Sequence, residues 1–211
     1  MPIVVPFQRG QTIIERVPPR VRGRIGLYRC YGDRSERLFR KSNQVQYTWG
    51  HIAAMTIGRG LRNYRVSAMY MEFANVADPV DAVAVPSSFG REEDMDYYAD
   101  LALSPDHDYL RVPLAQDPMV SIEAGYEAYF PEGTGNKLTF FALSQGTQGV
   151  HGKTFSDSVN SKLVGLALVA TPVWADRTQD IVFARTYFDV ADQALKEASH
   201  QIGSTWETAF E

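Results

Sequence analysis

One stretch, Lys162–Phe188, restricts the possible folds of this chain more than any other. Its first part, Leu163–Ala175, contains no charged residue. That run is shorter than the about 20 apolar residues that a membrane-spanning helix needs, and Gly165 and Pro172 disfavour a buried helix. After a short turn, Ile181–Phe188 is again largely apolar and rich in residues that favour strands. We predict two strands that lie buried in the centre of a sheet.

The clearest alternation of apolar and polar residues in the chain lies in Ser121–Phe130. Its even-numbered residues are apolar or aromatic, and its odd-numbered residues are mostly polar or small. The sequence PEGTGN follows as a turn, and Lys137–Leu143 is again typical of a strand. This pattern predicts an antiparallel β-hairpin with one face in water.

The rest of the chain predicts a mainly β protein with few helices. Ser88–Leu103 is interpreted as a helix, because four acidic residues crowd its first turns, where the helix dipole favours negative charge. His51–Gly60 and Asp189–His200 are further candidate helices, and Asp33–Lys41 is either a short helix or a loop. Regular turn signals favour an antiparallel β-sandwich or a jelly-roll-like barrel with one or two short helices. The remaining strands are predicted at Leu27–Tyr31, Gln44–Trp49, Arg65–Phe73, Tyr109–Leu114 and Ser204–Phe210.

The first part of the chain has the composition of an extended basic arm. Four prolines and three glycines in residues 1–26 exclude a long helix there. Residues 1–41 hold ten Lys and Arg and three acidic residues, a charge of +7, so the remaining 170 residues carry −11 of the total charge of −4. We predict that residues 1–26 form an extended N-terminal arm and that residues 27–211 form a single β-rich domain.

The arginines of this arm are the candidate contacts between subunits. Arg20, Arg22 and Arg24 alternate with other residues, so an extended chain points their guanidinium groups the same way. A basic arm on an acidic body favours an arm of one copy lying on the acidic surface of another copy. A solvated arm without a partner is the alternative. The candidate contact residues are Arg16, Arg20, Arg22 and Arg24.

The loop Gly146–Thr154 is similar to a phosphate-binding P-loop, because it ends in Gly-Lys-Thr. The P-loop motif requires a glycine where this chain has Thr147. It also requires a helix N-terminus directly after the loop, and the sequence FSDSVNSKLVG does not favour a helix. A glycine-rich connection between strands is the preferred interpretation, and a nucleotide-binding enzyme that uses Lys153 is an alternative.

No other motif predicts catalysis, metal binding or membrane insertion. The four histidines lack the spacing of metal ligands. Cys30 is the only cysteine, so no internal disulfide is expected, which fits synthesis in a cytoplasm. The N-terminus does not match a signal peptide. We predict no catalytic residue, no cofactor, no metal and no membrane partner, and the net charge does not indicate nucleic-acid binding.

Six stretches of sequence follow one another in a distinctive order along the chain. They are Phe89–Arg91, Asp94–Leu103 (DMDYYADLAL), Asp108–Leu114 (DYLRVPL), Gly152–Gly165 (GKTFSDSVNSKLVG), Asp180–Phe188 (DIVFARTYF) and His200–Glu207 (HQIGSTWE). In this order they resemble small virion structural proteins of tailed bacteriophages. The resemblance covers about residues 89–207 and leaves the arm outside. It implies a non-enzymatic component of the particle that is present in many copies, and it supplies no catalytic residues.

The resemblance implies a protein that is made in the host bacterial cytoplasm and assembled into the virion. Such a protein decorates or cements the head, or serves as a neck or tail adaptor. Its partners would be copies of itself and other virion proteins, such as capsid, portal, neck or tail proteins. A carbohydrate- or receptor-binding β-sandwich is the alternative, and it would require aromatic residues such as Trp174, Trp206 and Tyr129 to cluster on an exposed face. The central stretch would instead be an oligomer interface if Leu166, Leu168, Val182 and Phe188 were exposed in a single subunit.

Overall fold

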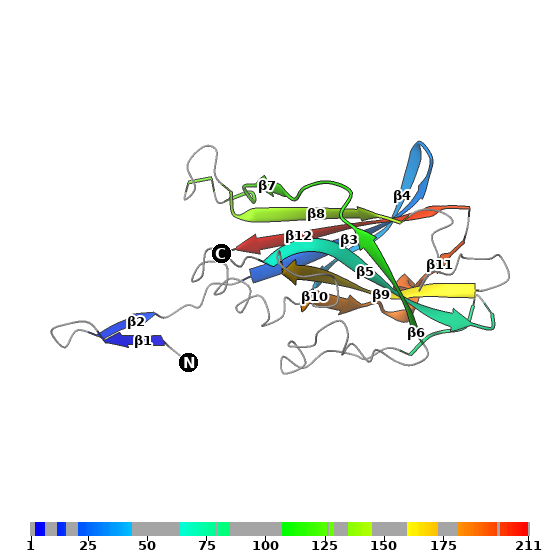
Figure 1. Cartoon of the computed structure of the whole chain (residues 1–211), viewed down its shortest axis with the longest axis horizontal. Coiled ribbons are helices and arrows are strands. Elements are labelled where there is room, and N and C mark those ends of the chain that lie inside the picture. Colours follow the sequence, from blue (N-terminus) through cyan, green and yellow to red (C-terminus); the bar gives the residue numbers. More distant parts are fainter. Residues whose placement is uncertain are drawn as a thin grey trace.

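The computed structural model shows a mainly β protein with two five-stranded antiparallel sheets and a separate two-stranded sheet (Figure 1). For β1, β2 and a few other strand residues, the structure describes the backbone alone. The described residues are 3–6, 12–15, 21–43, 64–78, 80–84, 107–125, 127–128, 135–144, 160–172, 181–197 and 199–210.

Sheet I has the strand order β4-β3-β12-β8-β7, and sheet II has the order β10-β9-β5-β6, with β11 also pairing with β9. The remaining strands, β1 and β2, pair with each other. The strands are β1 (Ile3–Pro6), β2 (Thr12–Glu15), β3 (Val21–Tyr31), β4 (Arg34–Asn43), β5 (Tyr64–Val76), β6 (His107–Pro113), β7 (Met119–Ser121), β8 (Lys137–Leu143), β9 (Asn160–Pro172), β10 (Ile181–Tyr187), β11 (Ala194–Lys196) and β12 (Gln201–Phe210).

The predicted central strand is confirmed as β9, which lies between β5 and β10. Every residue from Ser161 to Ala170 is buried, so both faces of β9 are shielded from water. This explains why the run carries no charge after Lys162, since a strand buried on both faces needs apolar residues throughout. Its partner β10 is also a strand as predicted, but it lies at the border of sheet II and not in its centre.

The core lies between the two sheets, where the inward residues of facing strands are apolar. From sheet I, Ile25 and Leu27 of β3 and Trp206 of β12 are fully buried, and Ile25 and Trp206 are directly paired. From sheet II, Met69 and Met71 of β5 pack into the same cluster. The alternative in which the central stretch is an oligomer interface required four residues to be exposed: Leu166, Leu168, Val182 and Phe188. Each of them is at most 1% exposed, so this alternative is wrong.

The two sheets are joined at both borders. At one border Leu114, just after β6, forms a bridge with Ala142 of β8. At the other border the Lys41 ammonium group of β4 lies 3.1 Å from Asp189 and 2.6 Å from Asp192, which follow β10. The arrangement is a β-sandwich and not a closed barrel, which agrees with the first of the two predicted architectures.

The predicted strand over Ser121–Phe130 is wrong in its position. Of the described residues from Met119 to Ala128, those that pair with β8 are Met119–Ser121, and the bounds of β8 agree with the prediction. After Ser121 the backbone N–H of Glu123 donates to the side-chain oxygen of Asn136 at 2.8 Å, which takes the chain out of the ladder. Gly125 then adopts a φ of 96°, a conformation outside the β region. Alternation alone therefore did not identify a strand here.

Two other predicted segments have different structures. Asp33–Lys41 is neither a helix nor a loop: almost all of it belongs to β4, which follows β3 through a tight turn with Gly32 at a φ of 57°. The charged residues of β4 are tolerated because this strand lies at the border of sheet I. Asp189–His200 is not a continuous helix, because it contains a single 3₁₀ turn, Val190–Asp192, and β11.

The predicted boundary of the arm at residue 26 is wrong. Val21 begins β3, which pairs with β12 as far as Phe210, so residues 21–26 belong to the sandwich. The predicted elements Gln44–Trp49, His51–Gly60 and Ser88–Leu103 lie outside the described residues. Among the residues that the structure describes, no helix is long and apolar enough to cross a membrane.

Candidate interaction surface

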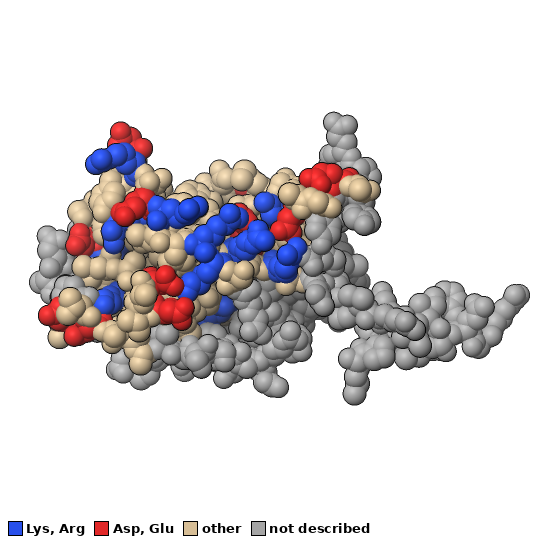
Figure 2. Space-filling model, turned by 180° about the vertical axis from the view of Figure 1, so that it is seen from behind, with Lys and Arg blue, Asp and Glu red and all other residues tan. Residues whose placement is uncertain are grey.

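Four arginines of β3 and β4 lie on the outer face of sheet I. Because Ile25 points into the core, its neighbours Arg22 and Arg24 point the other way. Arg40 pairs with Gly26 and Arg37 pairs with Tyr28, which places both on the same outer face. Figure 2 shows Lys and Arg side chains gathered in a band on the side of the molecule that carries these strands. We call Arg22, Arg24, Arg37 and Arg40 the arginine face.

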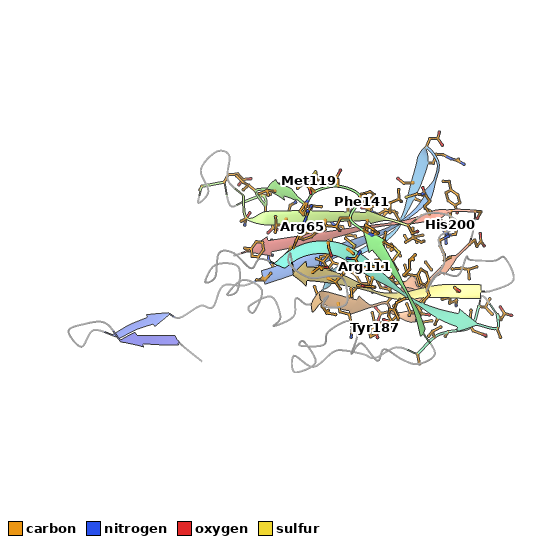
Figure 3. All side chains as sticks on the ribbon, viewed as in Figure 1. Arg65, Arg111, Met119, Phe141, Tyr187 and His200 are labelled. Carbon is orange, nitrogen blue, oxygen red and sulfur yellow. The ribbon has the colours of Figure 1, made fainter. Side chains whose placement is uncertain are left out.

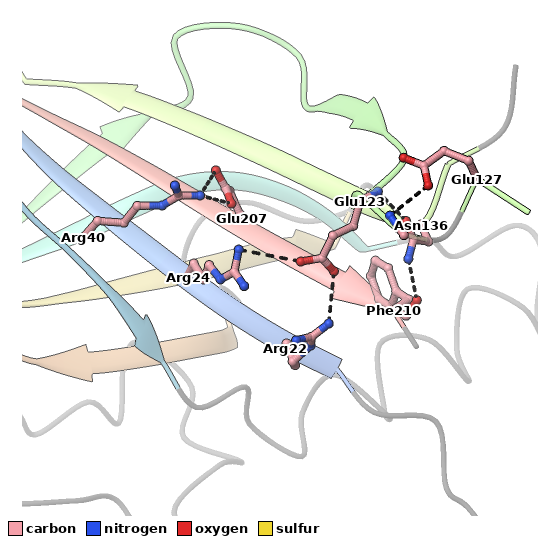
Figure 4. Close-up of polar contacts among 9 residues, drawn as sticks. Arg22, Arg24, Arg40, Glu123, Glu127, Asn136, Glu207 and Phe210 are labelled. Carbon is pink, nitrogen blue, oxygen red and sulfur yellow. Dashed lines mark hydrogen bonds and ion pairs between the residues drawn. The ribbon is translucent and has the colours of Figure 1, made fainter. Parts of the chain in front are cut away.

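Two glutamates from distant parts of the chain form ion pairs with this face (Figure 4). Glu123 lies 3.4 Å from Arg22 and 3.7 Å from Arg24, so one carboxylate serves two guanidinium groups. Both carboxylate oxygens of Glu207 accept hydrogen bonds from Arg40, at 3.0 and 2.8 Å. The four arginines outnumber the two glutamates that pair with them in the described part of the chain. Half-exposed pairs of this kind contribute about 0–1 kcal/mol each, so they mainly fix the positions of the arginines.

Asn136 explains how Glu123 comes to lie beside β3. Its side chain is almost fully buried and accepts a hydrogen bond from the Glu123 backbone. The same side chain donates to the carbonyl of Phe210 at 3.1 Å. The segment after β7 is thereby attached to the end of β12, next to the start of β3. Sequence reasoning missed this link, because the three residues are far apart in the chain.

The structure describes two of the four predicted contact residues. Arg22 and Arg24 lie on one face, as their alternation predicts, and both pair with Glu123 of the same chain. They belong to the sandwich and not to a free arm. Arg16 and Arg20 lie outside the described residues.

A row of polar side chains crosses the other face of sheet II. Tyr109 of β6, Glu72 of β5, Gly165 of β9 and Tyr187 of β10 are paired in sequence across the four strands. The hydroxyl of Tyr187 donates to Glu72 at 3.1 Å. A Cβ atom at Gly165 would touch the ring of Tyr187, so this glycine leaves room for the ring beside β9. Glu72 and Arg185 are 4% and 6% exposed, so a buried carboxylate and a buried guanidinium lie on this face.

Tyr109, at one end of this row, is held in its neutral form. Burial, and the negative charge of neighbouring Glu72, raise the pKa of Tyr109 far above its usual value. A phenol with so high a pKa does not release a proton near neutral pH and is a poor general acid or base. The row therefore joins four strands, and Tyr109 is not suited to acid–base chemistry.

A buried lysine lies where β11 meets β12. Lys196 is 2% exposed, and its ammonium group donates to the carbonyls of His200, at 2.8 Å, and of Glu197. Burial lowers its pKa to about 8. Burial also lowers the pKa of His200, and nearby Lys196 and Arg29 add to that shift. A lysine with a low pKa can act as a nucleophile, but this one is directed at main-chain carbonyls.

The burial of Lys196 should make the free energy of unfolding depend on pH. In the unfolded chain a lysine titrates near pH 10.4, so between pH 8 and 10.4 the unfolded state binds more protons than the folded state. The free energy of unfolding contributed by Lys196 therefore rises with pH in that window. We expect the wild type to gain on the order of 1–3 kcal/mol over Lys196→Met between pH 8 and 10.4 in urea titrations. Cys30 and Tyr109, whose pKa values are raised, are common to both proteins and cancel in the difference. A difference that does not change with pH would contradict this account.

An open pocket of about 430 Å³ lies at the end of β5, beside the junction of the two sheets. Arg65 and Arg111 both line it (Figure 3). Arg65 pairs with Asp117 at 2.7 Å, and Arg111 donates to the hydroxyl of Ser67 at 3.0 Å. Both arginines are thus engaged within the chain. No sequence signal connects these residues, because the register of β5 and β6 brings them together.

The other residues singled out by sequence do not form a site in the described structure. The loop Gly146–Thr154, Trp174 and Tyr129 lie outside the described residues. Trp206 is fully buried, which removes it from any exposed aromatic cluster of a carbohydrate-binding face. Burial raises the pKa of Cys30, which disfavours the reactive thiolate. Within the described ranges, no group of three or more His, Cys, Asp or Glu could hold a metal ion.

The fold and surface together define an antiparallel two-sheet β-sandwich with a basic outer face and a separate N-terminal hairpin. No protein family, no curated protein and no solved structure matches the chain.

Proposed function

We propose that this protein is a non-enzymatic structural subunit of a tailed-bacteriophage virion, present in many copies. It decorates or cements the head, or acts as a neck or tail adaptor, and it binds copies of itself and other virion proteins. One observation carries the proposal: within the described residues, β1 and β2 pair only with each other, and Figure 1 draws this hairpin to one side of the sandwich. A hairpin that adds nothing to the two larger sheets is available to a neighbouring subunit.

The buried ionisable groups support a structural role over a catalytic one. Glu72 accepts a hydrogen bond from Tyr187 within sheet II, and Lys196 donates hydrogen bonds to main-chain carbonyls. Each holds strands together. The arginine face adds a positively charged surface on a chain whose net charge is −4, so copies of the chain offer complementary charges to each other.

Removal of residues 2–20 tests the proposal, because the cut falls before β3 and leaves the sandwich whole. We expect the truncated protein to unfold at the same urea concentration as the full chain and to lose self-association, measured by sedimentation velocity. The matched control replaces Arg16 and Arg20 with glutamine, which removes the charge of the predicted contacts and keeps the hairpin. Normal assembly of the truncated protein would contradict the proposed role of this segment.

A further inference from the structure

Among the described strands, β7 is the last of sheet I on one side, and it is largely apolar. Met119, Val120 and Ser121 pair with β8 on one side, and no described strand pairs with the other side. Met119 is 54% exposed and Val120 is 64% exposed, although both are large apolar residues (Figure 3). A strand edge with free backbone groups is a template for pairing with another strand, and most proteins protect such edges with charge.

The β1–β2 hairpin forms a two-stranded sheet that pairs with no other described strand. Five of its eight strand residues are Ile or Val, in the sequences IVVP and TIIE. A two-stranded hairpin on its own is at best marginally stable in water, and further strands are needed to stabilise it. Within the described part of the chain neither strand pairs with any other. The hairpin therefore needs a strand edge or an apolar surface from elsewhere.

The charges around the two elements are opposite. Arg9 lies between the two strands of the hairpin in the sequence, and Arg16 follows Glu15, the last residue of β2. Exposed Asp117, which is paired with Arg65, precedes β7 by two residues, and exposed Glu127 follows the end of β7 by six residues. An apolar hairpin with two nearby arginines thus meets a short apolar edge with two nearby carboxylates, and these charges would guide the encounter.

We propose that the β1–β2 hairpin of one copy adds to the β7 edge of sheet I in a second copy. The hairpin extends sheet I by strand addition: backbone hydrogen bonds supply the pairing, and its Ile and Val residues cover Met119 and Val120. This inference rests on the proposed function and names the surface that receives the hairpin.

Disulfide trapping between separate chains tests the inference directly. In a Cys30→Ser background, one protein carries Val4→Cys and another carries Val120→Cys, so any disulfide between these positions must join two chains. We expect the mixed proteins to form this disulfide under mild oxidation at least tenfold more than a mixture with Val190→Cys in place of Val120→Cys. Val190 is the matched control because it is 56% exposed on another part of the chain.

A charge on the edge provides the second test. Val120→Lys should leave the urea unfolding midpoint unchanged, since the side chain is exposed, and should weaken self-association at least tenfold. Val190→Lys should leave self-association unchanged. If truncation of residues 2–20 abolishes assembly while Val120→Lys assembles normally and no disulfide forms, this inference fails and the proposed function stands. If the disulfide forms only when both cysteines are on one chain, the hairpin binds its own sheet and the inference is overturned.

Discussion

Replacing Trp206 with alanine is expected to lower the free energy of unfolding by about 3–5 kcal/mol. The indole is fully buried on β12, in the middle of sheet I, and it faces the residues of sheet II across the core. Its removal leaves a large cavity that the paired strands on both sides cannot close, because their backbones are fixed by the ladder. Since domains are stable by only about 5–15 kcal/mol, urea titration should show a large shift of the midpoint.

Trp206→Phe is the matched control. Phenylalanine keeps most of the buried apolar area, and the indole N–H that it removes has no hydrogen-bond partner among the described residues. We expect a cost of about 1–2 kcal/mol from the smaller ring, well below that of alanine. A loss of less than about 1 kcal/mol in the free energy of unfolding for Trp206→Ala would mean that the stability of the core does not depend on the packing of this indole.

The second large effect is expected at Gly165. A Cβ atom added there would lie 2.7 Å from Cδ1 of Tyr187 and 3.0 Å from the carbonyl oxygen of Thr186. The ring of Tyr187 must then move, and its hydrogen bond to Glu72 is lost, which leaves a buried carboxylate with one donor fewer. We expect Gly165→Ala to cost about 2–4 kcal/mol, from overpacking together with the lost hydrogen bond.

A double-mutant cycle separates these two causes. Tyr187→Phe removes only the hydroxyl and should cost about 1–3 kcal/mol, because its acceptor is a buried carboxylate. In a Tyr187→Ala background the ring is absent, so Gly165→Ala should cost clearly less than it does in the wild type. An equal cost in both backgrounds would place the strain in the backbone of Thr186 and not in the tyrosine ring.

Sequence reasoning identified the strands whose burial is evident from the apolar character of their own residues. β9 is uncharged after Lys162 because both of its faces are covered, and the largely apolar β5 is likewise buried on both faces from Ala68 to Ala74. β8 alternates because one of its faces packs on the core. β4 was missed because a border strand tolerates charge on either side, so its composition resembles that of a loop. The alternation in Ser121–Phe130 misled because the hydrogen bond from Glu123 to Asn136 decides the backbone path, and periodicity carries no information about it.

The arginine face and the row on sheet II were predictable only in part, because their contacts depend on how distant strands pair. Alternation along the chain was enough to place Arg22 and Arg24 on one face. Their partner Glu123 is about 100 residues away in the chain. It lies beside them because three strands pair with one another, and local sequence patterns do not predict that pairing. The row that joins Glu72, Gly165 and Tyr187 likewise depends on the register of β5, β9 and β10.

The position of β12 affects how the protein can fold while it is being synthesised. β12 lies between β3 and β8, yet it follows every other strand of the sandwich in the chain. Until it leaves the ribosome, Ile25 and Leu27 of β3 lack the neighbour that completes their sheet, and the nascent chain exposes apolar strand edges. Pairing of the first and last strands of a sandwich is also slow, because the loop to be closed is almost the whole chain. We expect folding to begin in sheet II, whose strands are complete earlier, and to finish only when synthesis of β12 is over.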